Sequence, residues 1–199
     1  MRDRDVRDVV VRDLQAAHLH DPTTRIVQEM GIWSGTVRID VATINGELSG
    51  FELKSDRDTL ERLPTQAKYY GLVFDRLTLV CGSKHIEKAK KIVPKWWGII
   101  SARENNGQII LENLQEPELN KEIDPFLVAQ LLWKEEAIAV LDRYNLAKGF
   151  RSKAARVIHQ RMAHELPLET LTFEVRAALK SRDGWLGQPI GYQRNVPIQ

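Results

Sequence analysis

The chain has 199 residues, of which 43% are hydrophobic and 28% are charged, and its formal net charge is +2 at pH 7. Such a composition belongs to an ordinary globular protein, and the length suits one domain with an appendage or with a small second domain. The single cysteine, Cys81, excludes an internal disulfide and a metal site built from several cysteines. No apolar run approaches the roughly 18 residues of a membrane helix, and the Arg- and Asp-rich N-terminus is unlike a signal peptide. We therefore expect a cytoplasmic protein with no membrane partner.

The first part of the chain has the pattern of a helix, a strand and a hairpin. Residues 3–19 place valines at helical spacing with Arg and Asp on the outer face, which predicts an amphipathic helix. Residues 25–32 are predicted to form the first strand. Residues 36–54 contain two β-rich runs on either side of Asn45-Gly46, which is a strong hairpin signal.

The middle of the chain predicts a crossover connection. Pro64 suits the first turn of a helix that runs to about Phe74. Residues 77–81 are a continuous apolar run, typical of a strand buried on both faces. The order strand, helix, strand makes this run parallel to the strand that ends at Lys54.

A short helix and a second hairpin are predicted next. Residues 83–93 predict the helix, and residues 98–102 and 108–111 flank Glu-Asn-Asn-Gly, another hairpin signal. We expect the neighbouring pair Trp96-Trp97 to pack in the core rather than to bind a partner.

From Pro117 onward the pattern is helical, with helices predicted over residues 124–145, 151–165 and 168–180. Between Arg143 and Arg182 there are nine Lys and Arg against three Glu, a net charge of +6, so residues 1–142 sum to −4. This asymmetry fits an element that faces nucleic acid and, equally, a solvated helical surface. We divide the chain into a core, a helical segment packed on it and an extended tail, over residues 1–116, 117–183 and 184–199.

Three charged residues of the first hairpin are candidates for one catalytic centre. Glu52 and Lys54 are two positions apart, so a strand projects both from the same face. Asp40 lies in the preceding run, and the opposite face of that run is expected to hold Val37, Ile39 and Val41. Similarly, Phe51 and Leu53 are expected on the buried face of the second run.

The pairing register decides whether Asp40 joins this pair. A two-residue loop would place Asp40 opposite Phe51 and turn it away from Glu52 and Lys54. The three charged groups converge only if the register slips by one residue, through a three-residue loop or a bulge at Gly46 or Gly50. We predict this irregularity.

The three residue types suit hydrolysis of a phosphodiester. Two carboxylates and a backbone carbonyl, here that of Leu53, are hard oxygen ligands for Mg²⁺ or Mn²⁺. Such an ion polarises the phosphoryl oxygen, and a lysine assists the attacking water or stabilises the developing charge. Asp40 and Glu52 are then the ligands, Lys54 assists, and Glu29 on the first strand is a further candidate ligand. The alternative is an exposed Glu-Lys ion pair on an edge strand, because an Asp followed by Glu-x-Lys is common by chance.

Several segments together resemble the PD-(D/E)XK nuclease superfamily. The hairpin contains Arg38-Ile39-Asp40 and Gly50-Phe51-Glu52-Leu53-Lys54-Ser55, and Gln66 lies on the following helix. The likeness is closest to a branch of small bacterial and phage proteins, and it also includes Ser55-Asp56, Asp58 to Pro64, Pro94 to Gly98 and Leu131 to Glu136. It covers about residues 3–140, and the combination is much more specific than Asp, Glu and Lys alone.

The resemblance implies an α/β, restriction-endonuclease-like fold with a mixed central sheet flanked by helices, followed by the all-helical C-terminal segment. It implies that Asp40 is the metal-binding acid, Glu52 the second acid and Lys54 the catalytic lysine. Gln66 matches a glutamine that part of the superfamily places near the phosphate or the active site. Ile39 replaces the proline of the name-giving motif.

The resemblance leaves the number of metal ions open. Many members place an additional acid on the first helix, and this chain has no clear match for it. Asp8 and Asp13 are candidates by location, and Glu29 is an alternative. The implied cofactor is Mg²⁺ or Mn²⁺.

We therefore expect a divalent-metal-dependent DNA phosphodiesterase in phage biology, defence or DNA repair. DNA is the expected partner, and a second copy or a phage or host protein is a further candidate. Residues predicted to contact nucleic acid are Arg38, Ser55, Tyr70, Arg151, Lys153, Arg156 and Arg161. One alternative is a catalytically silent nuclease fold that binds DNA or a protein. Another is a scaffold that dimerises through Trp96, Trp97 and Trp133.

Overall fold

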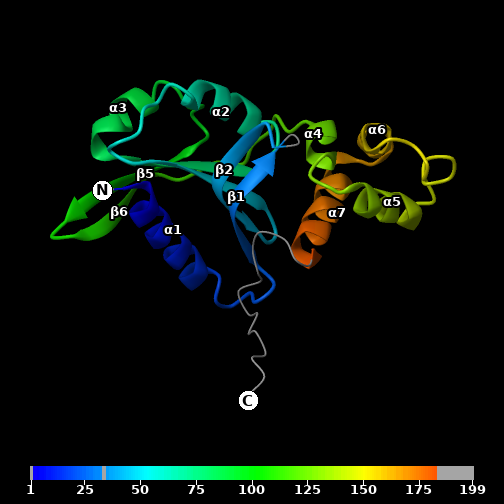
Figure 1. The fold of residues 1–199 in the computed structure, drawn as a ribbon, viewed down its shortest axis with the longest axis horizontal. Coiled ribbons are helices and arrows are strands. Elements are labelled where there is room, and N and C mark those ends of the chain that lie inside the picture. Colours follow the sequence, from blue (N-terminus) through cyan, green and yellow to red (C-terminus); the bar gives the residue numbers. More distant parts are fainter. Residues whose placement is uncertain (1, 33–34, 183–199) are drawn as a thin grey trace, which may run out of the picture.

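The computed structural model describes residues 2–32 and 35–182. Its centre is a six-stranded mixed sheet in the order β1-β2-β3-β4-β5-β6 (Figure 1). Neighbouring strands are antiparallel except for the β3–β4 and β4–β5 pairs, which are parallel as the crossover pattern predicts. The strands are β1 (Arg25–Ile32), β2 (Val37–Ile44), β3 (Leu48–Lys54), β4 (Arg76–Gly82), β5 (Gly98–Asn105) and β6 (Gln108–Gln115). The sequence-based expectation of a mixed α/β fold is confirmed.

Helices cover both faces of the sheet (Figure 1). α1 (Asp3–Ala17) packs on one face through Val6 and Val10, which join a cluster with Val41, Leu53 and Val80. The other face carries α2 (Leu63–Tyr70), η1 (Ser83–His85) and α3 (Ile86–Ala89). In the part of the chain that the structure describes, no helix is both long and apolar enough to cross a membrane.

The tryptophan pair belongs mainly to the core, as expected. Trp97 is fully buried, and its ring stacks on that of Tyr70 with centroids 6.5 Å apart. Trp96 is partly buried against the same cluster. Trp97 is therefore not available for the dimer surface that the scaffold alternative requires.

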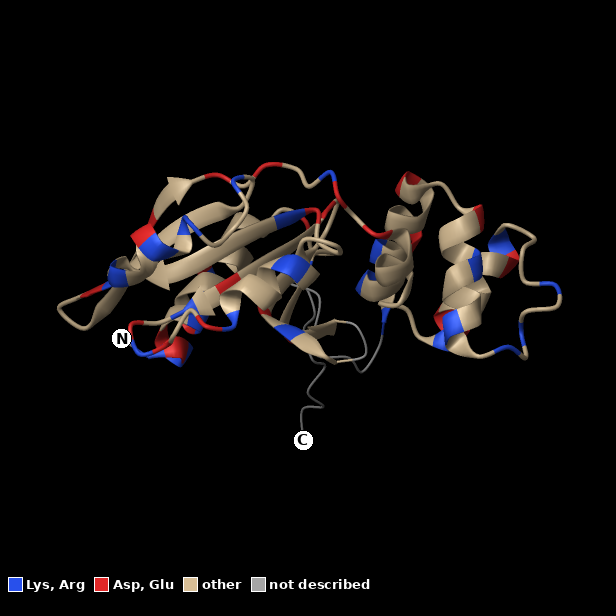
Figure 2. Ribbon diagram, turned by 90° about the horizontal axis from the view of Figure 1, so that it is seen from above, with Lys and Arg blue, Asp and Glu red and all other residues tan. Residues whose placement is uncertain are grey.

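The C-terminal segment is helical and forms a lobe beside the sheet (Figure 2). It contains α4 (Pro125–Ala129), α5 (Lys134–Arg143), α6 (Ala155–Glu165) and α7 (Leu168–Ser181). Its apolar residues join the larger core cluster of the sheet. Asp75, just before β4, accepts hydrogen bonds from the Leu48 N–H at 2.6 Å and from Arg176 of α7 at 3.2 Å, which ties the lobe to the sheet. The predicted tail over residues 184–199 lies outside the described residues.

Several predicted helix boundaries are wrong. α2 ends at Tyr70 instead of near Phe74, and the helix expected over residues 83–93 is η1 followed by α3, which ends at Ala89. The single helix expected over residues 124–145 is divided into α4 and α5, because long-range donors take the carbonyls at the break. Arg182 donates to the Leu131 carbonyl at 2.9 Å, and His159 Nε2 donates to the Leu132 carbonyl at 3.1 Å. The helix expected from Arg151 begins at Ala155.

The β2–β3 hairpin has the predicted register. Ile44 pairs with Leu48, so the loop has three residues, Asn45, Gly46 and Glu47, and no bulge is needed. Neither Asn45 nor Gly46 has a positive φ, so the pair does not form the two-residue turn that favours Asn-Gly. Continuing this register places Asp40 opposite Glu52.

The predicted faces of β2 are correct only in part. Val37 and Ile39 pack in the cluster beneath α2, whereas Val41 packs beneath α1. The alternation therefore changes phase at Asp40. Across the β1–β2 ladder from this point is Glu29, which has a left-handed φ of 55°. That conformation is uncommon for a residue with a side chain, and it lies across from the point where the alternation of β2 changes.

Candidate active site

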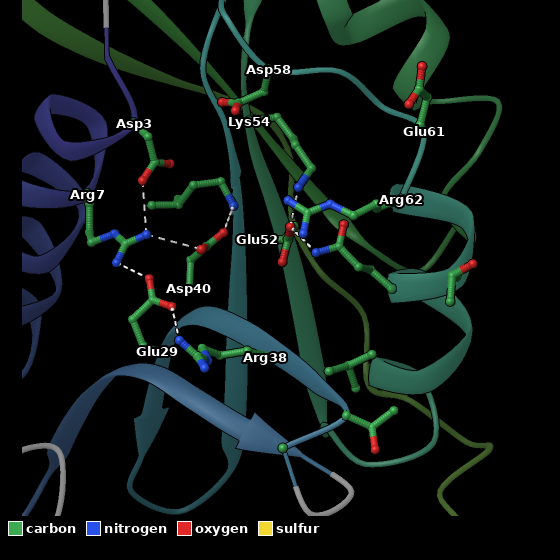
Figure 3. Close-up of a pocket in the computed structure, with 16 residues that line it drawn as sticks. Asp3, Arg7, Glu29, Arg38, Asp40, Glu52, Lys54, Asp58, Glu61 and Arg62 are labelled. Carbon is green, nitrogen blue, oxygen red and sulfur yellow. Dashed lines mark hydrogen bonds and ion pairs between the residues drawn. The ribbon is translucent and has the colours of Figure 1, made fainter.

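The charged residues of the β2–β3 hairpin line a cavity of about 760 Å³ (Figure 3). The cavity lies between α1, β2, β3 and the start of α2. Six carboxylates and four Lys or Arg side chains line the cavity, an excess of two negative charges. The charged residues are Asp3, Arg7, Glu29, Arg38, Asp40, Glu52, Lys54, Asp58, Glu61 and Arg62. The cavity is thus a highly charged site that is short of positive charge.

Glu52 and Lys54 lie on the same face of β3, as their spacing predicts, and their side chains form an ion pair. The Glu52 side chain is only 1% exposed. Gln66 donates to Glu52 Oε1 at 2.6 Å, and the Tyr70 hydroxyl lies 3.0 Å from Oε2. Burial raises the pKa of Glu52, and the charge of Lys54 opposes this rise. Three protein donors therefore hold this carboxylate in place.

Tyr70 connects the two strands behind the cavity. Its hydroxyl lies 2.5 Å from the Arg38 carbonyl on β2, in addition to its contact with Glu52 on β3. Burial raises the pKa of this phenol above its ordinary value, so the hydroxyl stays protonated. Tyr70 is fully buried, which contradicts its predicted contact with nucleic acid. Its role in the structure is to position Glu52.

Asp40 lies where β2 separates from β3. Its Oδ2 accepts a hydrogen bond from the Leu53 N–H at 2.8 Å, and its Oδ1 accepts one from Arg7 at 3.2 Å. Burial, followed by the negative charge of Glu52, raises the pKa of Asp40 to about 7. The structure thus brings together the three residues predicted to form the centre.

Arg7, which the sequence analysis missed, projects from α1 into the same cavity (Figure 3). It donates to Asp3 at 2.9 Å and to Asp40, and it pairs with Glu29. The Asp3–Arg7 spacing is that of an ordinary surface pair on a helix, so it carried no signal. Asp8 and Asp13, the candidate acids by location, have side chains 71% and 54% exposed and do not line the cavity.

Comparisons with known proteins give the family. A family model described as Bacteriophage P4 protein cII matches residues 1–185. The chain belongs to this family. It is 27% identical over 182 residues to Protein cII of Enterobacteria phage P4, a match that covers 92% of this chain and 68% of the phage protein. A solved structure, the SPO1766 protein of unknown function from Silicibacter pomeroyi, is similar over 70% of this chain and 89% of its own, at 19% identity and a TM-score of 0.38.

The donor set of this cII-family protein fits a hard divalent cation. Glu52 is buried and the Asp40 side chain is 19% exposed, and burial is the first cause of the raised pKa of each carboxyl. Within residues 2–32 and 35–182, no three His, Cys, Asp or Glu side chains are grouped closely enough to hold a metal. An ion bound here would therefore need the Leu53 carbonyl or water to complete its oxygen ligands. Glu29 is engaged by Arg7 and Arg38 instead of joining the pair.

The residues predicted to bind nucleic acid are distributed unevenly in the cII-family chain. Arg38 lines the cavity with a side chain 60% exposed. Ser55 is buried, and its hydroxyl donates to Asp58 at 2.6 Å, which contradicts a direct contact with DNA.

The basic residues near α6 do not form the expected helical row. Arg151 and Lys153 precede the helix, and Arg151 pairs with Asp142 at 2.6 Å. Arg156 lies over the Phe126 ring, and Arg161 pairs with Glu165. Lys and Arg positions of this lobe are interspersed with acidic ones, and α6 lies at the opposite end of the molecule from α1 (Figures 1 and 2).

Proposed function

We propose that this cII-family protein is a divalent-metal-dependent DNA phosphodiesterase of the PD-(D/E)XK type, which acts in phage biology, defence or DNA repair. The observation that carries the proposal is the convergence of Asp40, Glu52 and Lys54 in one cavity through a three-residue hairpin loop. An exposed ion pair on an edge strand does not explain it, because Glu52 and Lys54 are buried and β3 is an inner strand.

The charge of the cavity supports a requirement for metal. A phosphodiester is an anion, and the lining residues carry an excess of two negative charges when all of their side chains are ionised. A divalent ion held by Asp40, Glu52 and the Leu53 carbonyl would neutralise this excess, polarise the phosphoryl oxygen and acidify an attacking water. Without such an ion the cavity would repel its substrate.

The chain's own residues then have separate tasks. Lys54 presents its ammonium group beside Glu52, where it orients the attacking water or stabilises charge that develops on the phosphate. Gln66 and Tyr70 fix the Glu52 carboxylate. Arg38, and Arg62 in the opening of α2, supply positive charge at the cavity for the neighbouring phosphates of a DNA strand.

Cleavage of mixed DNA substrates with Mg²⁺ or Mn²⁺ tests this proposal. Lys54→Ala should lose activity by about 100-fold or more, as expected for a group that acts in the transition state. Lys68→Ala is the matched control, because Lys68 is an exposed lysine on α2 outside the cavity lining, and it should cleave like wild type. Equal activity of wild type and Lys54→Ala would show that cleavage does not come from this site.

A silent binding module is the second candidate, and one observation favours it. Both oxygens of Asp40 and both oxygens of Glu52 already have protein partners, so the network is closed without metal. This candidate expects DNA or protein binding that needs no divalent ion and that persists in Asp40→Asn. Binding assays with EDTA or Mg²⁺, beside the cleavage assays, separate the two functions.

A further inference from the structure

The Arg7 guanidinium lies at the point where three carboxylates from three different elements meet. Asp3 comes from the first turn of α1, Glu29 from β1 and Asp40 from β2, and each contacts a terminal nitrogen of Arg7 (Figure 3). We propose that Arg7 is a built-in cation in the place of a second metal ion, so that the centre takes one divalent ion per chain. This inference rests on the proposed metal-dependent function.

The position of Asp40 between two sets of groups leads to this assignment. In sites with two metals the ions lie about 3.5–4 Å apart, and together they contact the reacting phosphate. Asp40 faces Glu52 and Leu53 on one side, which is the side proposed to hold the metal. On its other side are Glu29 and Asp3, and their carboxylate oxygens are of the ligand type that a second divalent ion prefers. Arg7 occupies that second side.

The arrangement is specific rather than a chance surface contact. The Arg7 side chain is only 17% exposed, and among the described residues its buried Nε has no hydrogen-bond partner. Its terminal nitrogens therefore account for its polar contacts. Glu29 reaches Arg7 from a backbone with a φ of 55°, a conformation that is unfavourable for a residue other than glycine. The fold thus tolerates local costs at both residues of this ion pair.

A fixed guanidinium differs from a metal ion in its effect. It carries one positive charge instead of two, it does not dissociate, and it has no position open for a water molecule. Arg7 therefore pairs permanently with three carboxylates and offsets one of their negative charges, but it leaves activation of water to the single ion. Removing Arg7 takes from Asp3, Glu29 and Asp40 the one cation that all three contact. The partly exposed Asp3 and Glu29 side chains should then turn toward Asp40, and the three carboxylates should bind a second ion.

Calorimetric titration with Mn²⁺ in the absence of DNA measures the number of ions directly. Wild type should bind one ion per chain, and Arg7→Ala should bind two. The double variant Arg7→Ala/Glu29→Gln should return to one. Arg4→Ala is the matched control, because Arg4 lies on the same helix with a side chain 89% exposed and should leave the number at one. Electron paramagnetic resonance of the Mn²⁺ forms should show a spin-coupled pair in Arg7→Ala and none in wild type, Arg4→Ala or the double variant.

A second variant guards against loss of folding. Arg7→Gln keeps much of the aliphatic packing, and its amide oxygen is itself an acceptable ligand, so it should also bind two ions. Two ions in wild type, or one in both folded Arg7 variants, would overturn the inference. If wild type, like Asp40→Asn, binds no ion, the proposed function itself fails. If wild type binds one ion, the Arg7 variants alone decide the role of Arg7.

Discussion

The Asp40 carboxylate accepts a hydrogen bond from the Leu53 N–H at 2.8 Å, beyond the last backbone pair of β2 and β3, Val41 with Phe51. The side chain of one strand thus takes the place of a ladder carbonyl where the strands separate. This contact holds Asp40 between the strands and beside Glu52, and it explains how an acid on β2 reaches a centre built mainly on β3.

The raised pKa of Asp40 predicts that the ionised Asp40 carboxylate destabilises the folded protein at high pH. The folded protein holds the Asp40 proton more tightly than the unfolded chain between the ordinary value of 3.8 and about 7. The free energy of unfolding therefore falls as pH rises through this window, and the penalty is complete above it. The raised pKa of Glu52 acts in the same direction.

Asp40→Asn removes the Asp40 penalty. In EDTA at pH 8 we expect its melting temperature to exceed that of wild type by about 3 °C or more, and the difference should vanish near pH 4. Asp13→Asn, an exposed carboxylate on α1, should show no such dependence. If the melting temperatures of wild type and Asp40→Asn differ by the same amount at every pH in this range, the assigned pKa of Asp40 is wrong.

Tyr70→Phe should reduce the support of Glu52 while it keeps the aromatic ring in the core. The change removes a hydroxyl that contacts both Glu52 and the Arg38 carbonyl, which should cost about 1–2 kcal/mol in the free energy of unfolding. The loss of support for Glu52 should lower Mn²⁺ affinity by roughly 10-fold or more. Tyr144→Phe removes a hydroxyl that donates to Glu174 in the C-terminal lobe, and it should leave Mn²⁺ affinity unchanged.

Gly50→Ala tests how closely β2, β3 and β4 pack behind the site. A Cβ at this position would lie 2.4 Å from Ile39 Cδ1 and 2.8 Å from Leu77 Cδ2. Such overpacking should lower the free energy of unfolding by about 1–3 kcal/mol, measured by urea denaturation. Gly46→Ala in the hairpin loop has no heavy atom within 4 Å of the new Cβ, and a similar loss there would argue against a steric cause.

Asp75→Asn should loosen the C-terminal lobe. Asp75 and Arg176 are 11% and 17% exposed, so the substitution leaves a largely buried guanidinium without its charge partner. We expect a loss of about 3 kcal/mol and faster hydrogen exchange in α7. Asp142→Asn breaks an exposed pair with Arg151 and should cost less than about 1 kcal/mol. Equal effects would mean that the buried pair has no special role.

Arg38→Ala should weaken DNA binding if the cavity is the proposed nuclease site. In a Lys54→Ala background, the slope of log affinity against log salt should decrease by about 1 for one lost phosphate contact. Arg156→Ala on α6 is the comparison, and it should keep the slope of its parent. If Arg156→Ala lowers the slope and Arg38→Ala does not, DNA binds to the C-terminal lobe instead of the cavity.

The bounds of helices and strands were predicted closely where nearby residues determine them. They were not predicted where hydrogen bonds from distant residues determine them. β1 has the predicted bounds, and α7 matches its prediction to within one residue, because periodicity and Pro167 are local features. The division between α4 and α5 depends on Arg182 and His159, which lie far along the chain from the carbonyls that they contact. Tertiary hydrogen bonds of this kind leave no mark on local periodicity.

The sequence by itself determined that Glu52 and Lys54 share a face, because side chains two apart in a strand must project together. It also limited Asp40 to a single register, and β2 and β3 adopt that register. Only the tertiary structure placed Arg7 beside Asp40 and Tyr70 behind Glu52, since these contacts join residues 33 and 18 positions apart. Strand geometry is periodic and can be inferred from spacing, whereas the approach of a helix to a sheet depends on the packing of the whole core.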